Sequence, residues 1–259
     1  MSKLKLSAIH LLNIKLLILL VIAFALRIYN FEEPFFTTDE VRLSYRGYSL
    51  VTTGKDEFGR VIPWIFNSLN DYQLPVSSYV STFGISMFGK SELGARLPFM
   101  LTGLVFILLL YYISKMFSSQ PSSWYWSGFI AATSPILIFY SKVPNEVIIL
   151  AVLILYIFYL LSKGKIRNFE LCLLFLVILL ASLTSKIAWL ILFPFTLYVL
   201  IVNRGQFFLQ QKQIIISCAF LIPLLVIFLF LQIPQSKRSL MENNFSLFSD
   251  VTIKNGINK

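Results

Sequence analysis

The chain has 259 residues, of which 57% are hydrophobic and only 13% are charged. Soluble domains carry about 25% charged residues, so the composition excludes an ordinary soluble enzyme and indicates an all-α integral membrane protein. The net charge of +10 comes from basic residues scattered between apolar runs, which argues against a nucleic-acid partner. Two cysteines inside apolar runs predict free thiols, and a single histidine excludes a histidine-rich metal site.

Apolar runs long enough to cross a bilayer recur along the chain. A crossing needs about twenty apolar residues, so we predict about seven transmembrane helices, over 9–29, 97–117, 124–142, 146–162, 169–185, 187–203 and 213–232. The first run has an alternative interpretation as a signal peptide, because basic residues precede it and Ala23-Phe24-Ala25 resembles a cleavage site. The later runs hold the protein in the membrane without a leader, which favours a retained first span.

The short loops predict the orientation of these spans, because basic residues gather on the cytoplasmic side. One side carries most of the loop lysines and arginines: Lys3, Lys5, Lys15, Lys163, Lys165, Arg167, Arg204 and Lys212. We therefore expect a multi-pass protein of the cell membrane with a cytoplasmic N-terminus. Residues 1–232 form the predicted membrane domain, its first outer loop covers about 30–96, and 233–259 is an outer polar tail.

The first outer loop contains two predicted helices that do not cross the membrane. Residues 39–53 carry polar side chains on one face and Val41, Tyr45 and Tyr48 on another, so this helix is expected to lie flat in the headgroup zone. Residues 75–89 form a second helix that is too short and too rich in serine to be a span. We expect it to be interfacial or re-entrant.

An acidic pair, Asp39-Glu40, begins the first of these helices. Thr37-Thr38-Asp39-Glu40 fits a capping box, in which Glu40 reaches back to the Thr37 amide, and capping is the simpler interpretation. A capping box uses Glu40 and leaves Asp39 available. A carboxylate just outside the membrane is suited to acid–base chemistry on a substrate carried by a lipid.

Four other charged residues at the outer boundary have both a functional and a simpler interpretation. Glu146 stands in the first turn of a helix, where the helix dipole favours an acid, yet an ionisable group at a membrane boundary is a functional candidate. Lys142 and Lys186 could bind a phosphate or extend to the interface, and Arg96 could simply anchor a helix start. We expect Asp39, Glu146 and at least one of these three cations to line a common cavity.

The order of these features resembles the GT-C glycosyltransferases of the protein O-mannosyltransferase and lipid A aminoarabinose transferase type. Its elements are, in chain order, Leu26-Arg27-Ile28-Tyr29, Asp39-Glu40, Thr53-Gly54, a helix from Pro75 to Phe88-Gly89, and Ser91-Glu92-Leu93-Gly94-Ala95-Arg96-Leu97-Pro98. The resemblance covers about residues 10–200, and the chain looks like an N-terminal portion of such an enzyme.

The resemblance implies transfer of a sugar from a polyprenyl-phosphate donor to a protein, lipid or glycan outside the cytoplasm. It implies catalytic roles for Asp39 and Glu146, and we add Glu40, Arg96, Lys142 and Lys186 as expected substrate-binding residues. Many family members have Lys-Pro or Glu-Lys-Pro where this chain has Gln73-Leu74-Pro75. This departure removes a phosphate-binding lysine and a metal-binding glutamate. We therefore assign no metal ligand, and the sequence does not decide whether the site binds a divalent cation.

The chemistry requires a base for the acceptor hydroxyl and a cation for the departing phosphate. An ionised aspartate can act as the base, typically worth about 10²–10⁴-fold in rate, and an arginine or lysine can stabilise the phosphate charge. Two alternatives are a transporter or flippase for lipid-linked sugars and an inactive scaffold of the same fold. A transport route is expected to place polar groups near the midplane of the membrane. Because relatives continue beyond this length, we also expect little activity from the chain alone.

Overall fold

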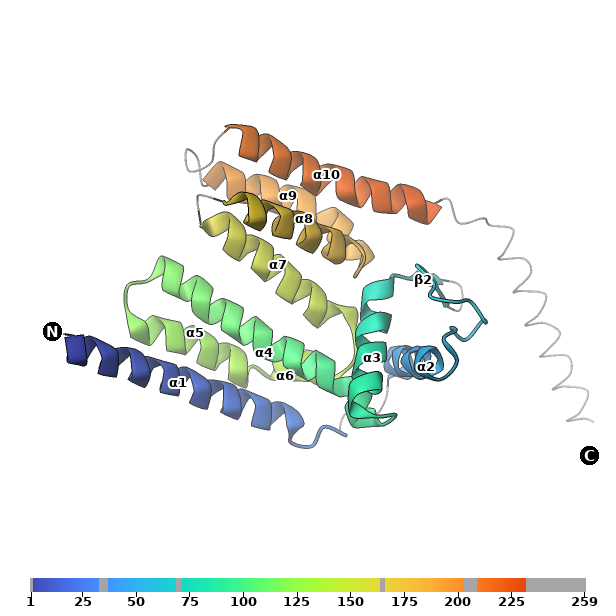
Figure 1. Ribbon diagram of the computed structural model, residues 1–259, viewed down its shortest axis with the longest axis horizontal. Helices are drawn as coiled ribbons and strands as arrows, with labels where there is room; N and C mark the ends of the chain where they lie inside the picture. Colours follow the sequence, from blue (N-terminus) through green and yellow to red (C-terminus); the bar gives the residue numbers. More distant parts are fainter. Residues whose placement is uncertain (1, 33–36, 69–70, 164–165, 203–208, 232–259) are drawn as a thin grey trace, which may run out of the picture. The chain divides into compact units, whose positions relative to one another are not determined.

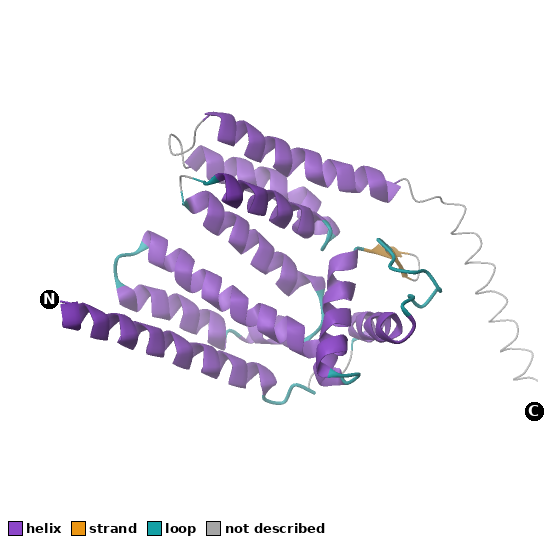
Figure 2. Cartoon of the chain, viewed as in Figure 1, coloured by secondary structure: helices purple, strands orange, loops and turns teal. Residues whose placement is uncertain are grey.

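The computed structural model describes residues 2–32, 37–68, 71–163, 166–202 and 209–231. This part of the chain is mostly helical, with one small β-hairpin (Figure 2). In chain order the elements are α1 (Ser2–Ile28), α2 (Thr38–Thr53), β1 (Phe66–Ser68), β2 (Asp71–Gln73), α3 (Pro75–Phe88), α4 (Glu92–Phe117), α5 (Pro121–Thr133), α6 (Pro135–Lys142), α7 (Glu146–Ser162), α8 (Asn168–Ser182), α9 (Lys186–Val202) and α10 (Leu209–Leu231).

The chain divides into two compact units, Met1–Pro223 and Leu224–Lys259. The first unit contains all the elements from α1 to α9 and the start of α10. The second unit is described only through Leu231, where it is helical. The predicted outer tail, 233–259, lies outside the described residues.

Helix α4 is the centre of the first unit, because it contacts α1, α2, α3, α5, α6 and α7 (Figure 1). One apolar cluster joins α1, α4 and α5 through Leu19, Ala23, Ile107, Ala131 and Ala132. A larger cluster joins α7, α8 and α9 with the start of α10. A third, around Phe99, connects α4 to the beginning of α7. Helices α4 and α7 therefore connect the other helices of the first unit.

The predicted spans correspond only in part to continuous helices. Among the described residues, α4 is the one helix both long and apolar enough to cross a membrane, and the bent pair α6–α7 adds a second if it counts as one span. Helices α8 and α9 are apolar but shorter. The count of seven spans therefore stays a prediction.

The predicted span 124–142 is not one helix, because the chain breaks at Ser134 between α5 and α6. Pro135 follows the break, and proline lacks an amide hydrogen and disfavours helical backbone in the residue before it. A second bend, of 115°, separates α6 from α7 at the residues around Pro144.

Both helices predicted in the first outer loop are present, as α2 and α3. Helix α2 begins at the N-cap Thr37, whose side chain accepts a hydrogen bond from the Glu40 amide, and ends at Gly54 with φ 69°. This left-handed conformation suits glycine at a helix end. The hairpin between the helices pairs Phe66 with Gln73 and was not predicted.

Buried Arg46 holds this hairpin against α2. Its guanidinium donates to Glu57 Oε1 at 2.6 Å, to Gln73 Oε1 at 2.5 Å and to the Asn67 carbonyl. It also lies over the Phe66 ring, 5.1 Å from the ring centroid. Burial lowers the pKa of Arg46, and the neighbouring Glu57 opposes that shift. One side chain therefore positions β2, which leads directly into α3.

Helices α3 and α4 cross closely at glycine positions. A Cβ atom at Gly84 would collide with the Pro98 ring and with the Gly94 carbonyl oxygen. Neither a proline ring nor backbone can move aside as a flexible side chain would, so the crossing depends on the missing side chain.

We predict that Gly84→Ala destabilises the fold by about 1–3 kcal/mol, the usual range for overpacking a well-packed site. The measurement is unfolding of the purified protein in detergent. Ser86→Ala, on the exposed face of the same helix, is the matched control and should change stability little. Equal stability of the two variants would contradict the close crossing.

Candidate functional site

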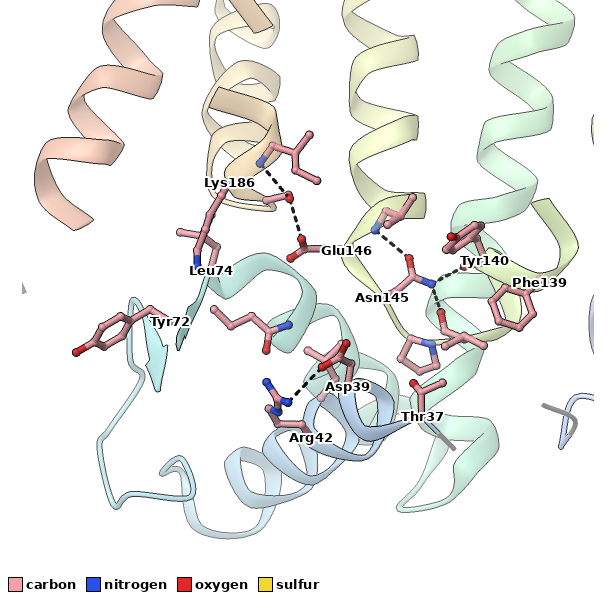
Figure 3. Close-up of a pocket in the computed structure, with 17 residues that line it drawn as sticks. Thr37, Asp39, Arg42, Tyr72, Leu74, Phe139, Tyr140, Asn145, Glu146 and Lys186 are labelled. Atoms are coloured by element: carbon pink, nitrogen blue, oxygen red, sulfur yellow. Dashed lines mark hydrogen bonds and ion pairs between the residues drawn. The ribbon is translucent and has the colours of Figure 1, made fainter. Parts of the chain in front are cut away.

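A cavity of about 530 Å³ lies between α2, the β-hairpin, the α6–α7 connection and the start of α9 (Figure 3). Three of the predicted site residues line it: Asp39, Glu146 and Lys186. Arg42 adds a second cation to the lining. Residues from four distant parts of the sequence therefore meet in one pocket, with two carboxylates and two cations on its wall.

Several helices begin at this pocket. Its lining includes the N-caps of α2, α3 and α7, namely Thr37, Leu74 and Asn145, together with Lys186, the first residue of α9. The unpaired amides at a helix start carry a partial positive charge and favour anions. The same effect stabilises the first-turn acids Asp39 and Glu146, so the pocket suits an anionic ligand held near carboxylates.

Asp39 extends from the first turn of α2, and its side chain is 76% exposed. The Arg42 guanidinium lies one turn further along and forms an ion pair with Asp39 Oδ1 at 3.2 Å. Because Asp39 is exposed on the pocket wall, a ligand can reach it without unfolding α2. The spacing of Asp39 and Arg42 places both side chains on the same face of the helix.

Glu146 enters the pocket from the start of α7, and Asn145 fixes its backbone. The Asn145 Oδ1 atom accepts hydrogen bonds from the Val147 and Ile148 amides at 2.9 and 3.2 Å. Its Nδ2 atom donates to the Tyr140 carbonyl at 2.9 Å, which joins the ends of α6 and α7. The Ser185 hydroxyl donates to Glu146 Oε1 at 2.7 Å and so orients the carboxylate.

Glu40 is not among the residues that line the pocket. Its carboxylate forms an ion pair with Arg96 of α4, and both side chains are fully buried. Arg96 also donates to the Phe31 carbonyl and pairs with Glu92 at 2.8 Å. Burial raises the pKa of Glu40, while Arg96 and a hydrogen bond from the Thr37 backbone act in the opposite direction. The pair joins the first turn of α2, which also carries Asp39, to α4.

Lys142 is also placed away from the pocket lining. Its Nζ atom donates to the Tyr29 carbonyl at 2.6 Å, at the end of α1. The lysine therefore satisfies a carbonyl that the last turn of a helix leaves without an intrahelical partner. Of the three cations expected near the two acids, the structure brings only Lys186 into the pocket.

Several residues that contribute to the site were not identified by the sequence analysis. Arg42 was not assigned to the site, although its three-residue spacing from Asp39 was a usable signal. Ser185 and Asn145 act through hydrogen bonds between segments remote in the sequence, which no local pattern indicates. Tyr72 and Gln73 line the pocket because Arg46 holds the hairpin in place.

Within the described residues, no three His, Cys, Asp or Glu side chains gather as a metal site. The pocket offers two carboxylates, Asp39 and Glu146. Magnesium is commonly held by one or two carboxylates together with substrate phosphates, so this pair fits a divalent cation only if the ligand supplies further oxygens.

The comparison with protein families gives one match. Residues 73–231 match the family model described as dolichyl-phosphate-mannose-protein mannosyltransferase, a range that covers more than half of the chain. No curated protein and no solved structure matches the chain. The matched range includes Glu146 and Lys186 and begins at Gln73, on the pocket wall.

We predict that Glu40→Gln lowers the free energy of unfolding by about 3–5 kcal/mol, because it leaves the buried Arg96 charge without its main partner. Glu92→Gln is the matched control, since it changes a second carboxylate on the same guanidinium. The Glu92 side chain is 27% exposed, so its loss should cost at most about 1 kcal/mol. Denaturation in detergent measures both, and equal losses would contradict the dominant role of Glu40.

Proposed function

The chain belongs to the dolichyl-phosphate-mannose-protein mannosyltransferase family, and on that premise we propose that it transfers a sugar from a polyprenyl-phosphate donor to an acceptor outside the cytoplasm. Membership implies a membrane glycosyltransferase of the mannosyltransferase type. The observation that carries the finer proposal is the meeting of Asp39, Glu146, Arg42 and Lys186 in one pocket.

The cations and the helix starts suit the phosphate end of such a donor. Arg42 and Lys186 lie on the pocket wall among the first residues of α2, α3, α7 and α9. Together they can neutralise a phosphate and stabilise the charge that develops as it departs. In our proposal the phosphate displaces the Asp39 carboxylate from Arg42, which leaves Asp39 available for the acceptor.

Asp39 then acts as the general base. The acceptor hydroxyl attacks the anomeric carbon, its proton passes to Asp39, and the bond between that carbon and the phosphate oxygen breaks. The phosphate leaves with the bonding electrons. A single displacement of this kind inverts the configuration of the anomeric centre.

Glu146 and the buried pair have supporting roles in this scheme. The Ser185 hydroxyl donates to Glu146 Oε1 and orients this carboxylate, which in our proposal contacts a sugar or acceptor hydroxyl. The Glu40–Arg96 pair fixes the first turn of α2 on α4. It thus sets the position of Asp39 without contacting the substrate.

We predict that Asp39→Asn lowers the rate of sugar transfer by at least about 100-fold, within the usual contribution of a general base. Asparagine keeps the size of the side chain and removes the proton acceptor. The measurement is transfer of labelled mannose from a polyprenyl-phosphate donor, in membranes where the unaltered protein supports turnover. Glu32→Gln, at an exposed acid that does not line the pocket, is the matched control and should retain full activity.

Membrane insertion of both variants is compared in the same preparations. Full turnover by Asp39→Asn would refute the general-base role. If neither the unaltered chain nor its variants transfer sugar but all bind the donor, the inactive scaffold becomes the better interpretation.

We also predict that Lys186→Ala raises the KM for the donor about tenfold, in the range expected for loss of one charge-assisted hydrogen bond. Lys90→Ala is the control, because Lys90 is exposed and lies over the Tyr48 ring, outside the pocket lining. Donor kinetics measured in proteoliposomes test this prediction. An unchanged KM in Lys186→Ala would remove Lys186 from the phosphate site.

A further inference from the structure

Arg27 lies near the end of α1 and is almost fully buried, with an exposed fraction of 1%. Ionisable residues inside a membrane segment are costly and commonly mark functional positions. Within the described residues, no carboxylate pairs with this guanidinium, which bonds to backbone carbonyls instead. We propose that Arg27 is a positioning residue, which holds the break between α5 and α6 so that Glu146 enters the pocket. The inference rests on the proposed function, because Glu146 takes part in that scheme.

The Arg27 guanidinium closes the end of α5. Its Nη1 atom donates to the Ala132 carbonyl at 3.4 Å and to the Ala23 carbonyl of its own helix at 2.9 Å. Ala132 lies in the last turn of α5, where carbonyls have no partner inside the helix. The ends of α1 and α5 carry partial negative charge, so a cation is stabilised between them without a carboxylate.

Helix α4 leaves room for this guanidinium at Gly103. A Cβ atom at Gly103 would lie 2.9 Å from Arg27 Nε and 2.6 Å from Ser141 Cβ. Ser141 belongs to α6 and is fully buried. The Arg27 side chain therefore lies at a junction of α1, α4, α5 and α6, where close packing leaves little room for α6 to shift.

Helix α6 is held to α1 at both of its ends. Just before its first residue, Pro135, Arg27 bonds to the Ala132 carbonyl. At its last residue, Lys142 Nζ donates to the Tyr29 carbonyl at 2.6 Å. The helix has only 8 residues and is therefore about 12 Å long. A displacement at its start is thus passed on to its end.

The end of α6 in turn determines where Glu146 stands. Asn145 Nδ2 donates to the Tyr140 carbonyl of α6 at 2.9 Å, and Asn145 Oδ1 accepts from the first amides of α7. Glu146 is the first residue of α7, beyond the bend of 115°. Contacts between neighbouring segments therefore connect Arg27 to Glu146 through α6.

Stability alone does not account for an arginine at this position. The Arg27 Nε atom is buried without a hydrogen-bond acceptor among the described residues, and an unbonded buried donor is costly. Replacing a buried charged group by an apolar side chain of similar size is often neutral for stability. We therefore expect Arg27→Met to fold and insert, and its effect to lie in the geometry of the pocket.

The first experiment is a double-mutant cycle between Arg27 and Glu146, measured as kcat for sugar transfer in proteoliposomes. Arg27→Met should lower kcat by about 10–100-fold with little change in the KM for the donor, because a small misplacement of a catalytic group costs this much. Arg27→Lys keeps a cation and should recover most of the loss. Arg27→Met added to Glu146→Gln should cost almost nothing further, since residues that act as a unit are not additive. Fully additive losses would overturn the connection to Glu146.

The second experiment disturbs the same junction without changing the Arg27 charge. Gly103→Ala places a Cβ atom against the guanidinium and α6, so it should lower kcat as Arg27→Met does. Gly128→Ala on α5 is the matched control, because its Cβ atom would meet Leu19 Cδ2 at 2.7 Å, the end of a flexible side chain that can move aside. Equal effects of the two alanine variants would indicate a general packing role and would overturn the proposal.

The third experiment does not depend on sugar transfer. Glu146→Cys and Asp39→Cys are made separately in a background without the two native cysteines, and their reaction with a charged maleimide is timed. Arg27→Met should raise the labelling rate at position 146, because the start of α7 is then less firmly held, and Arg27→Lys should restore it. The rate at position 39 should stay unchanged. An unchanged rate at position 146, or an equal change at both positions, would overturn the proposal.

The two kinds of measurement separate this inference from the proposed function. If labelling at position 146 responds to Arg27→Met but the unaltered protein transfers no sugar, the proposed function fails and the positioning of residue 146 by Arg27 stands. If sugar is transferred and neither kcat nor labelling responds to Arg27→Met, only the positioning role fails.

Discussion

The buried ion pair between Glu40 and Arg96 is the constraint on which the candidate site depends. Both side chains are fully buried, and they join the first turn of α2 to α4, the helix around which the first unit is packed. Removing one partner of such a pair leaves an uncompensated charge in a dry environment, so α2 cannot leave α4 cheaply. Asp39 immediately precedes Glu40 in the chain, and its side chain is 76% exposed. The two acids thus have different roles: the Glu40 carboxylate anchors α2 on α4, and the Asp39 carboxylate lines the pocket.

Acidic and basic side chains both line the pocket. Two carboxylates and two cations share the lining, and helix starts add positive potential. In the structure Arg42 pairs with Asp39, and Ser185 donates to Glu146, so each acid has a partner. An incoming phosphate would compete for Arg42 and thereby change the environment of Asp39. In the proposed mechanism, the Arg42 guanidinium would therefore couple binding of the donor to release of the Asp39 carboxylate.

The sequence predicted the outer-loop helices well, because their signals are local. Thr37 before α2, Gly54 after it and Pro75 at the start of α3 act through neighbouring backbone.

The hydropathy of 124–142 did not reveal the break within this segment. Hydropathy measures only how apolar a run is, whereas the break between α5 and α6 comes from the backbone restrictions of Pro135. Local sequence patterns also could not identify the bonding partners of Arg96 and Lys142. Arg96 pairs with a residue 56 positions away, and Lys142 bonds to a carbonyl 113 positions away, so only the packed fold assigns them.

The interruptions of the helices are what bring the second acid to the first. A straight helix through 135–162 would carry Glu146 along its side, with its amides paired inside the helix. The 115° bend between α6 and α7 instead makes Glu146 the first residue of a new helix. Asn145 satisfies two of the amides that this start exposes and also bonds back to α6. Pro144 suits the turn because proline cannot continue a helix. The bend therefore turns a residue of an apolar segment into a pocket residue facing α2.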